Sequence, residues 1–238
     1  MKLLVFGDIH NGPNFAGIEA AISAESPEQT IFLGDYFDQW GDTPFDVRRT
    51  AIWLKESLQK PNRIHLWGNH DLPYASLGSC PGWSEEKNAA VRDAFPPKAW
   101  EQLRLWYHTD SWLFSHAGLS RAHSCIPRRA EGLPKFLDDL EAEAWSALHA
   151  GQQHWVFAAG RSRGGSAECG GPLWCDLSEF KPIDYVNQVF GHTPMGRMVD
   201  ICGARSRNWC IDVSCPRGLP QALVIDELEC RLVPVAGD

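Results

Sequence analysis

The sequence predicts an α/β fold: a parallel sheet with helices on its faces, followed by a strand-rich second half. Short apolar runs alternate with segments of helical periodicity from Met1 to Trp67, which is typical of strand–helix–strand units. Several more short apolar runs follow Trp100. No linker rich in Pro, Gly or Ser interrupts the 238 residues, so we expect a single domain over residues 1–238.

The first part of the chain reads as three strands separated by two helices. Asn14 and Thr43 are suited to cap the two helices, and Pro44 is suited to the first turn of the second. The predicted strands are Met1–Phe6, Thr30–Leu33 and Arg63–Trp67, and the predicted helices are Asn14–Ala24 and Pro44–Leu58.

The second part reads as further short elements. Pro73–Trp100 is broken by Gly and Pro and predicts short helices, Pro134–His149 predicts an acidic helix, and the Gly-rich segment Gly160–Pro172 predicts a mobile loop. The apolar runs between and after these segments predict strands, which we expect to form a second sheet. These predicted strands are Leu103–His108, Ser111–Ser115, Tyr185–Phe190, Met198–Ile201, Asn208–Val213 and Ala222–Asp226.

Composition excludes several classes of protein. Apolar residues make up 44% and charged residues 22%, which is typical of a globular protein with a core. The 22 basic and 30 acidic residues give a net charge of −8, which disfavours binding to long nucleic acids. No apolar run reaches the roughly 18 residues of a membrane span, and the N-terminus lacks the pattern of a signal peptide. We therefore expect a cytoplasmic protein with no membrane partner.

The eight cysteines contain no CxxC pair. Five residues separate Cys169 from Cys175, and four separate Cys210 from Cys215. Neither spacing resembles a common zinc ribbon, so packed free thiols are expected.

Polar residues are concentrated where predicted strands end. In an open parallel sheet the carboxyl ends of the strands line one edge, where ligands bind, and each Gly lets the backbone turn sharply. We therefore expect the first three of these motifs to bring Asp, His and Asn side chains into one crevice, and the later two repeat the pattern. The motifs are Gly7-Asp8-Ile9-His10, Gly34-Asp35-Tyr36-Phe37-Asp38, Gly68-Asn69-His70-Asp71, Ser115-His116-Ala117-Gly118 and Gly191-His192-Thr193-Pro194.

This residue set favours a centre for two divalent ions. Oxygen and imidazole ligands suit manganese, iron or zinc, and one carboxylate can bridge two ions about 3.5–4 Å apart. Two such ions would offset the repulsion among Asp8, Asp35, Asp38 and Asp71. A water shared between them ionises near neutral pH and becomes a nucleophile for phosphorus.

The motifs GDxH, GDxxD, GNH[DE], HAG and GHT, in this order over residues 7–194, resemble those of the calcineurin-like metallophosphoesterases. GDYFD, SHAGLS, PLWCD and Cys210-Ile211-Asp212 are similar to the phosphoprotein-phosphatase branch, which includes small bacterial and phage phosphatases and diadenosine tetraphosphate hydrolases. The resemblance implies a four-layer sandwich of two mixed sheets flanked by helices.

The resemblance also assigns roles to residues. Asp8 and His10 would bind the first metal ion, Asp35 would bridge both ions, and a second group would complete the site of the second ion. His70 would protonate the leaving oxygen, with Asp38 orienting and charging it. The residues that would complete the site of the second ion are Asn69, His116 and His192. Asn69 would also touch the phosphate.

The sequence departs from this branch where arginines usually hold the phosphate. Gln39 follows the GDxxD motif where Arg is usual, and Asp176 stands at the second expected position. Gln cannot replace the charge of a bidentate Arg. Arg161 and Arg163 in the Gly-rich segment are candidate replacements, and the alternative role of each is solvated surface charge. The other candidates are Arg48, Arg49, Arg121 and Arg128.

The expected activity is hydrolysis of a phosphate ester by a metal-bridging hydroxide, with manganese as the first choice of metal and iron or zinc as alternatives. A phosphomonoester, such as a phosphorylated small molecule, nucleotide or phosphoprotein, is the first choice of substrate. The alternatives are a dinucleoside polyphosphate, whose bases Trp40, Trp67 or Trp174 could stack on, and a phosphodiester. A non-catalytic binding module is the remaining alternative.

Overall fold

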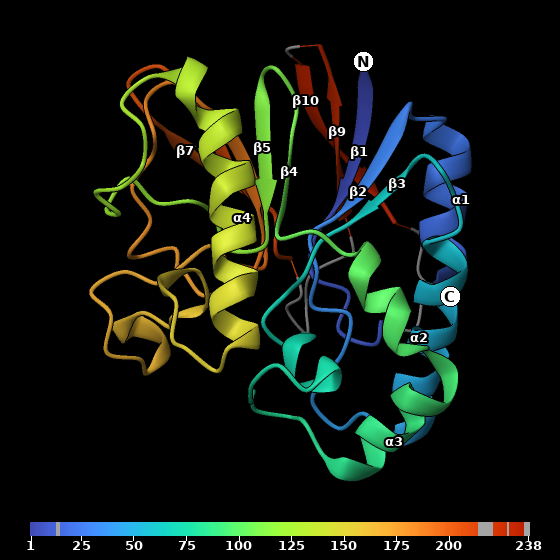
Figure 1. The fold of residues 1–238 in the computed structure, drawn as a ribbon. Coiled ribbons are helices and arrows are strands. Elements are labelled where there is room, and N and C mark those ends of the chain that lie inside the picture. The colour runs from blue at the N-terminus through green and yellow to red at the C-terminus, as the bar shows by residue number, and fades with distance from the viewer. Residues whose placement is uncertain (13–14, 214–220, 228, 236–238) are drawn as a thin grey trace. The chain divides into compact units, whose positions relative to one another are not determined.

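The computed structural model describes residues 1–12, 15–213, 221–227 and 229–235. These residues form two five-stranded mixed sheets, each with its own helices, which confirms the predicted fold class (Figure 1). Each sheet belongs to a separate compact unit. The first unit comprises Met1–Arg104, Pro194–Arg197 and Ile211–Asp238, and the second comprises Leu105–Thr193 and Met198–Cys210.

The sheet of the first unit has the strand order β10-β9-β1-β2-β3. β1 pairs in parallel with β2, and β2 with β3, as the alternation of strands and helices predicts. β9 and β10 are antiparallel to their neighbours, so the sheet is mixed. The strands are β1 (Lys2–Phe6), β2 (Gln29–Phe32), β3 (Arg63–His65), β9 (Gln221–Asp226) and β10 (Glu229–Pro234).

The last two strands differ from the sequence-based expectation. The run ending at Asp226 was expected in the second sheet, but β9 pairs with β1 from Lys2 opposite Asp226 to Phe6 opposite Ala222. β9 lies between β1 and β10, and its apolar residues from Ala222 to Ile225 are all buried. β10 was not predicted because most of its side chains are exposed, as is usual for an edge strand.

The helices of the first unit begin where the sequence indicates. α2 (Pro44–Ser57) has Pro44 in its first turn, and Thr43 and Asp46 form a reciprocal capping box. The predicted cap Asn14 of α1 (Phe15–Glu25) lies outside the described residues. The segment expected to hold short helices contains the 3-10 turns η1 (Leu72–Ala75) and η2 (Pro97–Gln102) and the α-helix α3 (Glu85–Ala94).

The sheet of the second unit has the order β4-β5-β6-β8-β7. Its three central strands β5, β6 and β8 are mutually parallel, and the two edge strands are antiparallel to their neighbours. The strands are β4 (Trp106–His108), β5 (Trp112–Ser115), β6 (Asn187–Phe190), β7 (Val199–Cys202) and β8 (Arg207–Cys210).

One long helix, α4 (Leu133–His149), accompanies this sheet (Figure 1). Its buried face includes Leu137, Leu140 and Ala144, and Glu141 accepts a hydrogen bond from the backbone of Leu105 at 3.1 Å. The Gly-rich segment predicted as a loop contains the 3-10 turn η5 (Arg161–Arg163). The other 3-10 turns of this unit are η3 (Ala130–Gly132) and η4 (Trp155–Phe157). Among the described residues, no helix is long and apolar enough to cross a membrane.

A neutral histidine lies in the core of the first unit. The ring of His65 stacks on Phe32 with centroids 4.6 Å apart, and its nitrogens pair with Tyr36 Oη and Ser57 Oγ, each at 2.9 Å. Burial, with a smaller effect of Arg63, lowers the pKa of His65 to about 3.

We predict that His65 makes the folded state less stable in acid. The unfolded chain binds a proton at His65 below pH ~6.5, but the folded chain resists it down to the depressed pKa. Stability should therefore fall as the pH drops from 7 towards 4, with this residue contributing at most about 1.4 kcal/mol per pH unit. Urea unfolding at pH 7 and pH 5 should show a smaller pH effect in His65→Gln than in the wild type. An equal effect in both proteins would contradict the assignment.

Candidate metal centre

Three loops that carry predicted site residues leave the same edge of the first sheet. Asp8 follows β1, Asp35 follows β2, and Asn69 and His70 follow β3. Because these three strands are mutually parallel, their carboxyl ends lie together. The structure thus supports the expected gathering of these motifs within the first unit.

Two glycines allow the second and third loops to approach each other closely. A Cβ atom on Gly34, which has φ +100°, would overlap the backbone of Trp67 and Gly68. A Cβ atom on Gly68 would overlap the backbone and the carboxylate of Asp35. Larger residues would force the two loops apart.

The carboxylate of Asp71 joins the same two loops. Its Oδ2 accepts hydrogen bonds from the backbone N–H groups of Asp35 at 3.0 Å and Gly68 at 2.8 Å. Its Oδ1 accepts one from the N–H of Tyr36 at 2.8 Å. Asp71 is completely buried. The sequence indicated only that Asp71 adds negative charge, whereas the structure shows that it positions Asp35.

Several site residues have strained backbone. His10, Asp35 and Asp38 have φ angles of 45°, 50° and 66°, in the left-handed region that non-glycine residues rarely adopt. Hydrogen bonds hold them there: the carbonyl of Asp35 accepts from the N–H groups of Ile9 at 3.0 Å and His10 at 2.8 Å. Such strain persists only where the surroundings enforce it, and it is concentrated at functional sites.

Asp8, His10 and Asp35 form a group whose donor atoms lie within 4.8 Å of one another. His10 Nε2 lies 3.7 Å from Asp8 Oδ2 and 3.7 Å from Asp35 Oδ2. The other ring nitrogen, Nδ1, lies 3.0 Å from the carbonyl oxygen of Phe37. A proton on Nδ1 would be donated to that carbonyl, which leaves the lone pair of Nε2 directed at the carboxylates. This tautomer and its supporting carbonyl are typical of histidine metal ligands, so the residues fit a divalent cation.

The charge balance of this group also favours a cation. Burial acts to lower the pKa of His10, but the nearby carboxylates of Asp35 and Asp8 outweigh burial and raise it. Two carboxylates beside one imidazole therefore attract positive charge, which a proton or a divalent ion can supply.

His70 and Asp38 are paired beside this group. His70 Nδ1 lies 3.3 Å from Asp38 Oδ2, and the backbone N–H of His70 donates to Asp35 Oδ1 at 2.8 Å. Burial acts to lower the pKa of His70, but the charges and hydrogen bonds of Asp35, Asp38 and Cys80 raise it to about 11. These charges and hydrogen bonds favour the protonated form of His70, which pairs with the Asp38 carboxylate.

Two residues missed by the sequence analysis, Tyr74 and Lys87, fix Asp38. Tyr74 Oη donates to Asp38 Oδ1 at 2.6 Å, and Lys87 Nζ lies 3.4 Å from the same oxygen. Lys87 is nearly buried, donates to the carbonyl of Gly82 at 2.8 Å and pairs with Asp42. Lys87 lies on α3, outside every motif, so no sequence signal identified it.

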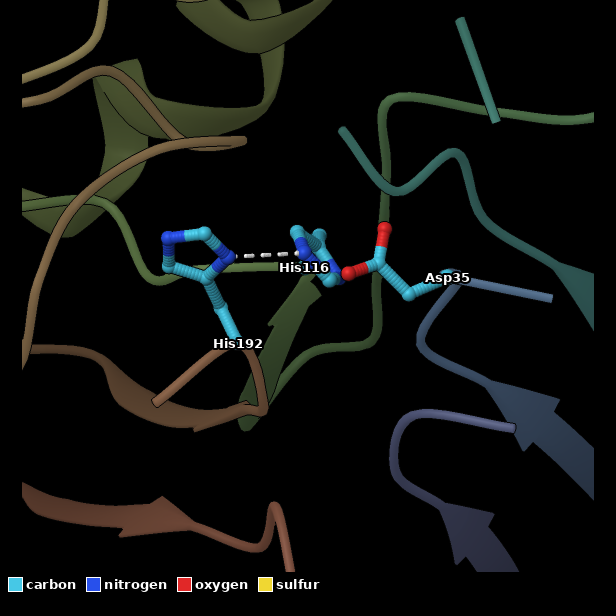
Figure 2. Close-up of side chains that lie close together, drawn as sticks. All are labelled: Asp35, His116 and His192. Atoms are coloured by element: carbon cyan, nitrogen blue, oxygen red, sulfur yellow. Dashed lines mark hydrogen bonds between the residues drawn. The ribbon is translucent and has the colours of Figure 1, made fainter. Parts of the chain in front are cut away.

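The second unit places two further predicted ligands together. His116 and His192 follow the parallel strands β5 and β6. His116 Nε2 lies 3.1 Å from His192 Nδ1, as the dashed line in Figure 2 shows. The N–H of Gly191 donates to the carbonyl of His116 at 2.7 Å, which fixes the two loops relative to each other. Both histidines are buried, and His192 also has a left-handed backbone, with φ 69°.

Arg163 supports the loop that carries His192. One of its guanidinium nitrogens donates to the carbonyl of His192 at 3.1 Å and to Thr193 Oγ1 at 3.0 Å. Its Nε lies 2.8 Å from Asp176 Oδ2. Three acceptors thus already occupy this side chain, and phosphate binding by Arg163 stays a prediction. Arg161 is exposed, and its predicted phosphate contact is also untested.

The remaining predicted residues lie as follows. Asn69 is buried, and its amide donates to Cys80 Sγ at 3.4 Å. Gln39 is exposed, and Trp40 beside it is fully exposed. Trp67 belongs to the core of the first unit, because it is buried and stacks on Trp100 with ring centroids 5.1 Å apart.

We predict that Asp71→Asn destabilises the first unit by about 1–3 kcal/mol, because an amide cannot accept all the hydrogen bonds of the buried carboxylate. Asp93→Asn is the matched control, since Asp93 is an exposed carboxylate paired with Arg48 and should change stability by less than about 0.5 kcal/mol. Urea unfolding measures both. Equal effects of the two substitutions would show that Asp71 does not hold the loops.

Comparison with known proteins identifies related sequences and folds. The family profile described as calcineurin-like phosphoesterase matches residues 1–196. A comparison with curated proteins finds no match.

Three solved structures illustrate the shared fold. A cold-active protein-tyrosine phosphatase of a psychrophile Shewanella sp. has a TM-score of 0.59 and 13% identity, covering 99% of this chain and 80% of that chain. A putative diadenosine tetraphosphatase has a TM-score of 0.56 and 17% identity, covering 100% of this chain and 95% of that chain. A protein serine/threonine phosphatase from Saccharomyces cerevisiae has a TM-score of 0.55 and 12% identity, covering 100% of this chain and 80% of that chain. At these identities the likeness concerns the fold alone.

Proposed function

We propose a dinuclear, metal-dependent phosphoesterase, on the premise that this chain belongs to the calcineurin-like phosphoesterase family. Membership implies a hydrolase that uses divalent metal ions. Beyond membership, we propose the number of ions, the residues that bind them and the class of substrate.

The arrangement of Asp8, His10 and Asp35 carries the proposal. Two carboxylates converge on the Nε2 of an imidazole whose Nδ1 pairs with the carbonyl of Phe37. We propose Asp8 and His10 as ligands of one ion and Asp35 as the ligand shared by two. Following the motif order, the ligands proposed to complete the second ion's set are Asn69, His116 and His192.

The ions, when bound, would polarise the phosphate and lower the pKa of the attacking water. The chain's own residues would supply and position the proton donor. His70, held as a cation by Asp38, would donate its proton to the leaving oxygen of the ester. Asp38 would keep the imidazolium charged and oriented, and Tyr74 and Lys87 would keep Asp38 in place. The amide of Asn69 would also contact the phosphate.

A phosphomonoester is the proposed substrate class. A cationic acid beside the carboxylate ligands suits a leaving alkoxide or phenoxide, which needs a proton. Two of the structures with similar folds are described as phosphatases that act on protein residues. Manganese as the metal and a cytoplasmic location stay predictions from the sequence.

A second candidate substrate is a dinucleoside polyphosphate. Trp40, two residues after Asp38, is fully exposed, and an exposed indole ring is able to stack on a nucleobase. The putative diadenosine tetraphosphatase of similar fold is consistent with this candidate.

A parallel assay tests the proposed function. Chelator-treated protein is supplied with Mn²⁺ and given p-nitrophenyl phosphate, bis-p-nitrophenyl phosphate and diadenosine tetraphosphate. The proposal requires Mn²⁺-dependent turnover, fastest on the monoester. Preference for the dinucleotide would favour the second candidate, and preference for the diester would refute the monoesterase assignment. Metal binding without turnover of any substrate would indicate a binding module.

We predict that His70→Asn lowers kcat on p-nitrophenyl phosphate by roughly 10²–10⁴-fold and leaves the metal content of the purified protein unchanged. His149→Asn is the control, because His149 is an exposed histidine at the end of α4, and its kcat should match the wild type. Loss of metal in His70→Asn would show that His70 is a ligand and not the proton donor.

A further inference from the structure

Two buried cysteines of the second unit lie side by side and outside the proposed catalytic machinery. The Sγ atoms of Cys169 and Cys175 are 3.8 Å apart, and both residues are buried. A carboxylate oxygen of Glu179 joins them, so that the three donor atoms lie within 4.8 Å of one another. A disulfide requires its sulfurs about 2.05 Å apart, so these are two separate thiols.

The distance between the sulfurs matches a shared tetrahedral ion. With zinc–sulfur bonds of about 2.3 Å and a tetrahedral angle, two thiolates on one zinc ion lie about 3.8 Å apart. Two thiolates and a carboxylate are also a donor set that suits zinc. We propose that Cys169, Cys175 and Glu179 bind a zinc ion, at a site separate from the proposed dinuclear centre.

The surroundings of the donors fit this role. The Glu179 carboxylate accepts from the N–H groups of Ser162 at 2.7 Å and Gly170 at 2.9 Å, which fixes its orientation as for a ligating carboxylate. His123 Nε2 lies 2.9 Å from the carbonyl oxygen of Gly170, the residue next to Cys169. Binding would release the thiol protons to solvent.

A cavity adjoins the proposed zinc site. Cys169 lines a cavity of about 270 Å³, together with His123, Trp155 and Lys181. Water in this cavity would supply the fourth ligand, since the described protein donors number three.

The ion would brace the segment from Cys169 to Glu179. Trp174, next to Cys175, packs edge-on against the ring of His192 with centroids 5.9 Å apart. The N–H of Leu177 donates to Thr193 Oγ1 at 3.1 Å. The zinc site would therefore support the loop that carries His192, although its existence does not depend on the proposed catalysis.

Cobalt substitution tests the proposal, because Co²⁺ bound by thiolates gives an intense sulfur-to-metal charge-transfer absorption that oxygen and imidazole ligands do not give. Protein purified with a phosphine reductant should show this absorption on addition of Co²⁺, and zinc should abolish it. Cys169→Ser and Cys175→Ser should lose it. Cys210→Ser should keep it, since Cys210 is a buried thiol of the same hydrophobic cluster but is not among the ligands.

A second measurement does not rely on substitution. In wild-type protein held in enough urea to expose its buried thiols, zinc should slow the alkylation of Cys169 and Cys175 by iodoacetamide and leave that of the equally buried Cys210 unchanged, as measured by peptide mass spectrometry. Absence of the charge-transfer band, unchanged alkylation in the presence of zinc, or a Cys169–Cys175 disulfide in the reduced preparation would each overturn the proposal.

Discussion

The three hydrogen bonds from backbone N–H groups to the Asp71 carboxylate are the constraint on which the first unit's site depends. They join the loop after β2 to the loop after β3, and the missing side chains of Gly34 and Gly68 make that junction possible. The junction places Asp35 in a left-handed conformation. From there its backbone carbonyl binds the loop after β1, and its carboxylate accepts from the N–H of His70. One buried carboxylate thus organises the three loops of the first unit that carry proposed site residues.

Electrostatics explains why this arrangement calls for cations. The chain has a net charge of −8, and several of its carboxylates are buried at this one sheet edge. Lys87 and the imidazolium of His70 compensate Asp38, whereas Asp8 and Asp35 face the lone pair of His10. Divalent ions bound there would reverse the local sign, so that a group of carboxylates that repels phosphate in the bare chain becomes a place where a phosphate is attracted.

Much of the fold and of the candidate site was predictable from the sequence, because the alternation of apolar runs with helical segments and the motifs that begin with glycine are local signals. Every strand except β10 was predicted, and so were the positions of the motifs at strand ends. The pairing of β9 with β1 was not, because an apolar run does not specify its partner strand. Nor were the roles of Tyr74 and Lys87, which reach Asp38 from distant segments without any motif. The Cys169–Cys175 spacing resembles no common zinc ribbon, and the proximity of Glu179 to both thiols emerged only from the fold.

Mn²⁺ binding to chelator-treated protein, followed by calorimetry, tests the central claim most directly. Manganese prefers oxygen and imidazole donors to thiolates, so it reports on the proposed dinuclear centre. The wild type should bind two ions per chain, and Asp35→Asn should weaken both, because this carboxylate is proposed to be the ligand that the ions share. Undiminished binding of both ions by Asp35→Asn, or binding of no Mn²⁺ by the wild type, would contradict the account.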